Sequence, residues 1–482
     1  MNMWNRWLWG VAALALALGA ETACAADPAW PDSVARANVG QKRYDRWCND
    51  YHEAFVYKIF LKQKLKPEIK ATLDQALEIM RRVHVYSGGM HQIVYLVGWQ
   101  HDGHDSMYPS WDVVGPQCRS SWSDDPTASL RELMRKGRAY NADVSLHICM
   151  NDAYTNSPLW QTYVDNDLIC READGSLAKG GVWGGERSYG ISHVKEFRSG
   201  FAQKRILRLL DMLPELRDTH TIHVDALYGI ESKYEKIGIQ EDVEAIGKMV
   251  DFWHAQGMDV TTEFLPALDQ IGVFPFFYHL NLDERLKTLC PPDVVCGGAG
   301  YNTRNTQNHY NKDWRGMMPL PGCVYEMAWG VAHWGDMTGL ALNDPRRMVE
   351  RLFEKPLLYA YYNRSRVVRH VEDTENYRVE RANGVVANVR MRDRALTVSD
   401  NGRTVVSDDD YFLDFPRDGG LMLAWSAKGC DRVFRLPSAY AGAKALAGRT
   451  QPDGAELSLD VKDGAVRLNL PARTGAVLKP RF

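Results

Sequence analysis

The chain has 482 residues, of which 45% are hydrophobic, and its 58 Lys and Arg against 61 Asp and Glu give a formal net charge of −3. This composition argues against a disordered chain, and the length is enough for one large domain plus a smaller one. The near-neutral charge provides no electrostatic footprint for nucleic acid or an anionic membrane, so we expect a neutral or weakly charged partner.

The N-terminus has the pattern of a secretory signal. Arg6 precedes an apolar run from Trp7 to Ala20, which is followed by the small residues 23–26, so residues 1–26 are predicted to be a cleaved signal peptide. The run is shorter than the ~20 apolar residues that span a bilayer, and no later segment approaches that length. Glu21 stands where a lipobox has an apolar residue, which argues against lipidation at Cys24. We expect an exported protein, periplasmic or secreted, that has no membrane attachment after cleavage.

Export also affects how the cysteines are interpreted, because an oxidising compartment favours disulfides. Cleavage removes Cys24, and an even set remains at positions 48, 118, 149, 170, 290, 296, 323 and 430. Some disulfide bonding is therefore predicted, and Cys290 and Cys296 are close enough in sequence to close a small loop, but spacing alone selects no pairing. The absence of a Cys-x-x-Cys pair gives little support to a zinc site.

Strands and helices are predicted to alternate through the middle of the chain. A helix over 67–85 is followed by short β-rich runs with helical patterns between them, the clearest being 201–213 and 241–256. The β-rich runs are 93–98, 145–149, 221–226, 260–264, 276–280 and 294–296. This rhythm indicates parallel βαβ units, and because no Gly-x-Gly-x-x-Gly opens a helix, it favours a (β/α)8 TIM-type barrel over an open doubly wound sheet. We expect an N-terminal helical extension at 27–92 and the barrel at 93–364.

From residue 365 to 482 the pattern changes to short strands separated by turns such as Asn383-Gly384, Asn401-Gly402 and Asp463-Gly464. Turn signals at this spacing predict an all-β sandwich domain. Such a domain is either a structural buttress for the barrel or a carbohydrate-binding module, and the buttress is the more general role.

Two acidic residues end consecutive predicted strands of the barrel. Asp225 closes Thr221–Asp225, and Glu263 lies in Val260–Phe264, 38 positions later. The C-terminal ends of barrel strands form the pocket, so both carboxyls are expected to face it. Glycoside hydrolysis needs such a pair, one carboxylate to attack the anomeric carbon and one acid to protonate the leaving oxygen. The alternative is that either acid caps a helix or pairs with a surface cation.

Two earlier strand ends add polar groups. The first loop holds Trp99, Asp102, His104 and Asp105, and the second is flanked by His147 and Asp152. We interpret these side chains as substrate-binding candidates. A metal site made by His101, His104 and Asp105 is an alternative, but we predict no metal because no further histidine cluster completes a ligand set. His147 and His223, inside strands, are also interpretable as core histidines.

Aromatic side chains near these loops fit the flat C–H faces of sugars. Trp99, Trp111, Trp183 and Tyr189 are examples. The Gly-rich segment 180–185 is interpretable as a lid that brings Trp183 over a ligand, or as a flexible connection.

Taken in order, these segments resemble glycoside hydrolase family 101, the endo-α-N-acetylgalactosaminidases. The loop 98–106 is similar to the family's Glu-Gly-His-Asp-Ser loop. The likeness continues through His147-Ile148, Asp152-Ala153-Tyr154, Arg187-Ser188-Tyr189, the run from Ile222 to Tyr228, and Thr262-Glu263.

The resemblance implies a retaining mechanism in which Asp225 is the nucleophile and Glu263 the general acid/base, with His104 and Asp105 in the loop that binds sugar hydroxyls. It also adds Tyr228 to the substrate-binding candidates. Two departures bear on the substrate: Asp102 stands where the family has Glu, and the family's His-Ile-Asn-Ala-Thr-Glu run is replaced by residues 147–152.

The sequence therefore predicts an exported, retaining endo-α-N-acetylgalactosaminidase-like hydrolase that acts on α-linked GalNAc-containing glycans and needs no cofactor. A structural Ca²⁺ stays open and is not predicted. One alternative is a retaining α-glycosidase, exo- or endo-acting, on a different bacterial polysaccharide. Another is a non-catalytic carbohydrate-binding barrel, against which the presence of both Asp225 and Glu263 argues.

Overall fold

The computed structural model describes residues 47–64, 68–264, 272–275, 277–279, 288, 290–295, 324–330, 334–408, 410–416 and 419–482. The predicted signal peptide lies outside these residues. In the described part of the chain no helix combines the length and the apolar character that crossing a bilayer requires.

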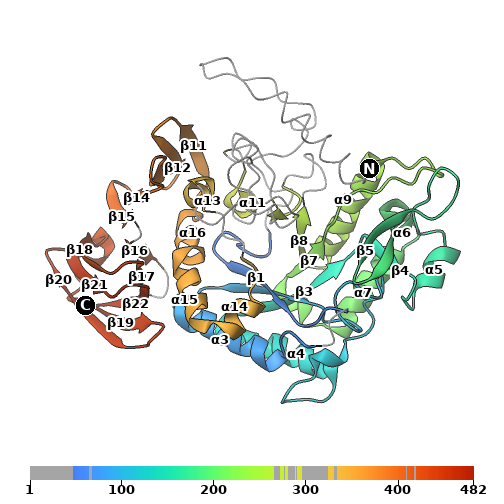
Figure 1. The fold of residues 1–482 in the computed structure, drawn as a ribbon, viewed down its shortest axis with the longest axis horizontal. Helices are drawn as coiled ribbons and strands as arrows, with labels where there is room; N and C mark the ends of the chain where they lie inside the picture. Colours follow the sequence, from blue (N-terminus) through green and yellow to red (C-terminus); the bar gives the residue numbers. More distant parts are fainter. Residues whose placement is uncertain are drawn as a thin grey trace.

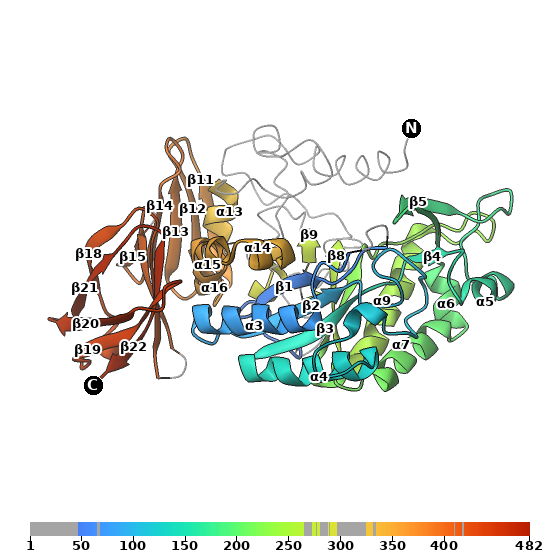
Figure 2. The ribbon, with the colours of Figure 1, turned by 60° about the horizontal axis from the view of Figure 1, so that its bottom comes forward.

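The N-terminal half of the described chain is a TIM-type barrel (Figure 1). Its sheet contains seven described strands in the order β10-β1-β2-β3-β7-β8-β9, and every pairing between them is parallel. The strands are β1 (Phe55–Phe60), β2 (Gln92–Val97), β3 (Ala142–Cys149), β7 (Thr221–Asp225), β8 (Asp259–Phe264), β9 (Phe277–His279) and β10 (Trp334–Asp336). Helices lie outside the strands (Figure 2), so that β2, for example, is buried over its whole length. A strand covered on both faces requires the continuous apolar sequence that β2 has.

The main helices between the barrel strands are α3 (Leu73–Ser87), α4 (Pro126–Gly137), α7 (Phe201–Met212) and α9 (Ile239–Ala255). Helix α3 shows how local sequence fixes such an element. A capping box between Thr72 and Gln75 starts it, Gly88 ends it in a left-handed conformation, and its apolar residues recur at helical spacing and are buried. Shorter helices are α5 (Trp160–Asp165), α6 (His193–Arg198), α8 (Leu216–Thr219), α11 (Pro292–Val295) and α13 (Val324–Trp329).

Two sequence-based expectations for this half differ from the structure. Strand β1 lies inside 27–92, where only a helical extension was expected, yet it pairs residue by residue with β2 and belongs to the barrel. The prediction of a strand at 294–296 is wrong for residues 294 and 295, which belong to helix α11 (Pro292–Val295). Residue 296 lies outside the described residues. Pro292 at the first helical position followed by Asp293 is a helix-start pattern, which competes with the β propensity of the two valines.

Residues 367–481 form an antiparallel β-sandwich of twelve described strands, reached through α14 (Thr338–Asn343), α15 (Pro345–Glu354) and α16 (Pro356–Tyr362). The strands run from β11 (Val367–Glu372) to β22 (Thr474–Arg481). Between these two lie β12 (Asn376–Arg381), β13 (Val385–Arg390), β14 (Leu396–Asp400), β15 (Arg403–Ser407), β16 (Asp410–Phe415), β17 (Leu421–Ser426), β18 (Cys430–Arg435), β19 (Ala445–Gln451), β20 (Glu456–Lys462) and β21 (Ala465–Leu470). The rings of Phe412 on β16 and Phe434 on β18 stack at 5.7 Å although these strands are not hydrogen-bonded neighbours. The sheet therefore folds back over its own core.

The sandwich is packed firmly onto the barrel (Figure 2). One buried apolar cluster runs through both parts. Phe353 of α15 stacks on Trp425 of β17 at 5.7 Å, and the indole N–H of Trp329 donates to the Tyr377 hydroxyl at 2.8 Å. A continuous core of this kind fits the expected buttress role.

The described cysteines include Cys118, Cys149, Cys170 and Cys430, which are thiols in this structure. Cys296 and Cys323 lie outside the described residues. Disulfide bonding therefore stays a prediction.

Candidate active site

Asp225 and Glu263 stand side by side at the C-terminal ends of neighbouring barrel strands. The register that pairs Val224 of β7 with Thr262 of β8 places these two acids at the next step along each strand. Each side chain is 18% exposed, at the mouth of the barrel. The structure thus brings together the two carboxyls that the sequence predicted to act as a pair.

His147 of β3 lies between the two carboxyls. Its Nε2 is 3.7 Å from Oδ1 of Asp225 and 4.0 Å from Oε1 of Glu263. Burial and the nearby Lys58 ammonium lower the pKa of His147 to about 3, so the imidazole is neutral at neutral pH. A neutral ring in this position is able to hydrogen-bond a carboxylate or a sugar hydroxyl without adding charge.

The loop after β2 brings His104 and Asp105 to the same pocket. Nε2 of His104 lies 3.3 Å from Oδ1 of Asp105 and 3.9 Å from Oδ2 of Asp225. The loop is anchored because the His104 N–H donates to the Lys62 carbonyl at 3.0 Å. Gly98 permits this approach, since it has a φ of +74° and a Cβ there would lie 1.9 Å from the same carbonyl oxygen.

Electrostatics in the pocket favour protonated carboxyls. Burial, followed by the charge of Glu263, raises the pKa of Asp225 well above its ordinary value. Burial and then Glu263 raise the pKa of Asp105 to about 6. Burial and then the Lys58 charge lower the pKa of His104 to about 4. Titratable groups shifted in this way, in one cleft, are typical of catalytic sites.

Asp152 and Tyr228 line the side of the pocket formed by the loops after β3 and β7. Asp152 begins β4 (Asp152–Tyr154), and burial raises its pKa to about 6, with Asp105 contributing in the same direction. Burial, then the charge of Asp152, raises the pKa of Tyr228, and Asp225 adds to this effect. Both predicted binding residues are thus within electrostatic reach of the carboxyl pair or the loop beside it.

The Gly-rich segment forms a hairpin at the barrel mouth. Strands β5 (Lys179–Trp183) and β6 (Glu186–Gly190) pair with β4 in a three-stranded sheet. Gly184 at the hairpin turn approaches the β2 loop so closely that a Cβ would lie 2.8 Å from the Asp105 carbonyl oxygen, and Glu186 pairs with Lys64. Trp183 beside this turn is 41% exposed. The hairpin therefore presents an open indole next to the pocket.

Three predicted binding residues do not share this surface. Trp99 is fully buried, and its indole N–H donates to the His147 carbonyl at 3.1 Å, so it supports the site from below. Tyr189 packs on Trp160 with ring centroids 4.9 Å apart, on the face of the small sheet opposite to Asp152. Asp102 is partly buried in the β2 loop, where one carboxyl oxygen has no hydrogen-bond partner among the described residues.

The candidate metal set of His101, His104 and Asp105 is not assembled, because the His101 ring lies 2.9 Å from the Ser110 hydroxyl. Three groups in the described residues are compact, with potential donor atoms within 4.8 Å, and two of them lie at the carboxyl pair: His104, His147 and Asp225, and His147, His223 and Glu263; the third is Asp50, His52 and Asp293. The Lys58 ammonium places a positive charge against Glu263, and the absence of a metal stays a prediction. His223 is fully buried and bonded to Thr261, as expected of a core histidine, and it stands directly behind the site.

Lys58 is the site residue that the sequence did not reveal. It lies on β1, its side chain is 8% exposed, and its Nζ is 2.6 Å from Oε1 of Glu263. The available signal was a single lysine inside the apolar run Phe55–Phe60, since a buried lysine requires an acidic partner. Because residues 27–92 are predicted to be a helical extension, the sequence analysis does not place Lys58 on a barrel strand.

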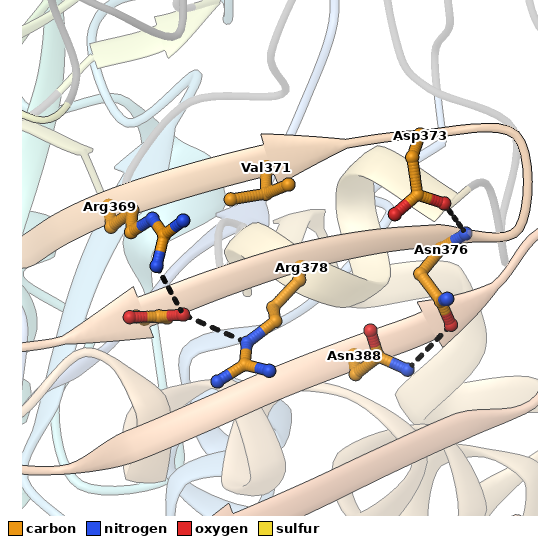
Figure 3. A pocket seen from close by; sticks show the side chains of 7 residues that line it. Arg369, Val371, Asp373, Asn376, Arg378 and Asn388 are labelled. Atoms are coloured by element: carbon orange, nitrogen blue, oxygen red, sulfur yellow. Dashed lines mark hydrogen bonds and ion pairs between the residues drawn. The ribbon is translucent and has the colours of Figure 1, made fainter.

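A further hollow, of about 360 Å³, lies on the sandwich across β11, β12 and β13 (Figure 3). Its polar groups are paired with one another. Arg369 and Arg378 lie 3.7 and 2.9 Å from Glu380, and Asn388 donates to Asn376 at 3.0 Å. Its lining includes no aromatic side chain. This surface lacks the stacking platform that sugars favour, so the barrel mouth is the candidate site.

Comparison with known proteins agrees with this geometry. A family model described as endo-alpha-N-acetylgalactosaminidase, of glycoside hydrolase family 101, matches residues 47–274, which include every residue placed in the pocket above. No curated protein matches the chain.

The solved structures that share the fold include the alpha-N-acetylgalactosaminidase NagBb from Bifidobacterium bifidum. Its ligand-free form is 16% identical with a TM-score of 0.51 over 76% of this chain, and its GalNAc complex is 16% identical with a TM-score of 0.51 over 77%. The chain spans 60% of each of those chains, and at this identity the likeness concerns the fold. The family match thus makes the barrel of this chain similar to glycoside hydrolase family 101 and supports a glycoside hydrolase.

Proposed function

We propose that the chain is an exported, retaining α-glycoside hydrolase that cleaves α-linked GalNAc-containing glycans. The observation that carries the proposal is the placement of Asp225 and Glu263 at the ends of adjacent strands, with Nε2 of His147 3.7 Å from one carboxyl and 4.0 Å from the other. Carboxyl groups about 5–5.5 Å apart serve retention, whereas inversion needs about 6.5–9.5 Å so that a water fits between them. Retention is proposed here on the family match.

In the first step the Asp225 carboxylate attacks the anomeric carbon while Glu263 gives its proton to the leaving oxygen, so that a covalent glycosyl-enzyme forms and the aglycone departs. In the second step ionised Glu263 takes a proton from water, the resulting hydroxide attacks the anomeric carbon, and the bond to Asp225 breaks. The reactive pair holds one proton, on Glu263, while Asp225 is ionised, so a proton that Asp225 carries in the free protein moves to Glu263 before the attack.

Polar groups around the pair fit a sugar with several hydroxyls. Neutral His104 and His147 are able to donate and accept, and Asp105 is able to bridge neighbouring hydroxyls. The GalNAc preference rests on the family match and on the name of the structural relatives. Export rests on the N-terminal pattern, and the two-carboxylate mechanism uses no cofactor.

A panel of aryl α-glycosides tests substrate and mechanism together. We expect release of para-nitrophenol from the α-GalNAc glycoside, from its Galβ1,3-GalNAc counterpart, or from both, and little release from the α-galactoside. Cleavage of the disaccharide indicates endo action, and cleavage of the monosaccharide alone indicates exo action. Proton NMR at early times should show the α anomer of the released sugar. Initial release of the β anomer would contradict retention, and cleavage of the α-galactoside alone would move the substrate to another glycan.

A further inference from the structure

Lys58 reaches the active site from the barrel strand that precedes all the motif residues. Strand β1 pairs in parallel with β2 and β10, and Lys58 crosses the barrel mouth to place Nζ 2.6 Å from Oε1 of Glu263 on β8. The lysine side chain is 8% exposed and the glutamate 18%. Desolvating an ammonium is costly, and an ion pair at this depth is retained only with close geometry.

We propose that Lys58 is a positioning residue that holds Glu263 in its ionised form, so that the proton of the carboxyl pair resides on Asp225 until a glycoside binds. This inference rests on the proposed function, because it assigns a proton location to the same two carboxyls. It gives Lys58 a role in the acid/base cycle through Glu263, without contact to the sugar.

The groups around Glu263 determine whether Lys58 has this effect. Lys58 faces it from β1, His147 from β3, and Asp225 together with His223 from β7. Asp105 and His104, whose pKa is lowered to about 4, act on it from the β2 loop. His147 is neutral at neutral pH, and the two aspartates oppose a second negative charge. Of these described neighbours, Lys58 carries the positive charge that favours ionised Glu263.

The charge of Lys58 has opposite consequences for the two chemical steps. It favours the second step, in which Glu263 acts as a base and must be ionised. It opposes the first step, in which Glu263 must be protonated. Formation of the glycosyl-enzyme also removes the negative charge of Asp225, so Lys58 then acts on Glu263 without a competing carboxylate.

The pH dependence of kcat/KM separates this role from simple packing. The variants are Lys58→Met, which removes the charge, Lys58→Gln as a second neutral variant, and Lys58→Arg, which keeps the charge. An opposite charge at this distance lowers a carboxyl pKa by about 1–3 units. Both limbs of the bell-shaped profile should therefore move to higher pH by about 1 unit or more in the neutral variants. Lys58→Arg should keep the parent limbs even if its rate falls.

Neutral variants that lose rate while both limbs of the pH profile stay in place would overturn the proposal.

A second measurement needs no turnover: the effect of Glu263→Gln on thermal unfolding, with and without Lys58→Met. We expect Glu263→Gln to lower the Tm at pH 7 when Lys58 is present, because it removes the carboxylate 2.6 Å from a buried ammonium, and not to lower it together with Lys58→Met. Equal effects in both backgrounds would overturn the ion-pair role. A parent that cleaves no glycoside refutes the proposed function, and this unfolding cycle still decides on Lys58.

Discussion

Nε2 of His147 lies 3.7 Å from Oδ1 of Asp225 while the His147 backbone carbonyl is bonded to the buried Trp99 indole. The backbone that carries this imidazole is therefore held by a buried residue outside the carboxyl cluster. Because the ring is neutral at neutral pH, it adds no positive charge beside Asp225. The geometry of the site therefore depends on the buried Trp99–His147 hydrogen bond as well as on the carboxyl pair.

Replacing Trp99 with Phe should damage both stability and catalysis. The His147 carbonyl loses a buried donor, which costs about 1–3 kcal/mol in the free energy of unfolding, and kcat should fall as the imidazole loses its fixed position. Urea unfolding and steady-state kinetics measure the two effects. Trp183→Phe is the matched control, since its exposed side chain should change unfolding by less than about 0.5 kcal/mol. Equal stability losses in the two variants would refute the supporting role of Trp99.

Glu263→Gln should cost more with poor leaving groups than with good ones. A general acid contributes about 10²–10⁴-fold, and that contribution matters most when the departing oxygen is strongly basic. We therefore expect the loss in kcat/KM to be larger for a natural glycan than for the para-nitrophenyl glycoside. The ratio of the two losses is the measurement. A uniform loss on both substrates would mean that Glu263 only binds the sugar.

Asp105→Asn should stabilise the protein at neutral pH. Burial and the Glu263 charge raise the pKa of Asp105 from its ordinary 3.8 to about 6 in the folded state. The folded state therefore holds this proton more tightly, and the associated stability is present below about pH 4 and lost as the pH rises to about 6. At pH 7 the variant avoids an ionised, buried carboxyl and should gain on the order of 1 kcal/mol. A thermal unfolding series from pH 4 to 7 should show a gain that disappears at the acidic end.

Gly184→Ala should weaken substrate turnover because it moves the hairpin away from the β2 loop. The new Cβ would lie 2.8 Å from the Asp105 carbonyl oxygen, and the residue has a φ of +53°. Gly200→Ala is the control, since Gly200 has a φ of +80° but no atom within 4 Å of the built Cβ. Both variants should lose about 1 kcal/mol of stability from the left-handed backbone. Only Gly184→Ala should lower kcat/KM, and an equal kinetic loss in both variants would contradict hairpin docking at the site.

The sequence predicted the carboxyl pair because an acid at the end of an apolar strand is a local pattern, and the barrel brings such ends together. It did not predict Lys58, because which side chain faces Glu263 across the barrel depends on the closure of the sheet. The sequence predicts Trp99 to stack on a sugar, because composition does not reveal which way an aromatic side chain points. Its position depends on how the loop after Gly98 folds back against Lys62.

The most direct test of the account compares the parent protein with Asp225→Ala on the para-nitrophenyl α-GalNAc glycosides, with circular dichroism to confirm that both are folded. Removal of a covalent nucleophile should lower kcat on the order of 10⁴-fold. Added azide should restore release of para-nitrophenol by attacking the anomeric carbon from the vacated face, and should give the β-glycosyl azide. A folded Asp225→Ala protein that keeps the parent rate would contradict the assignment of Asp225 and, with it, the proposed mechanism.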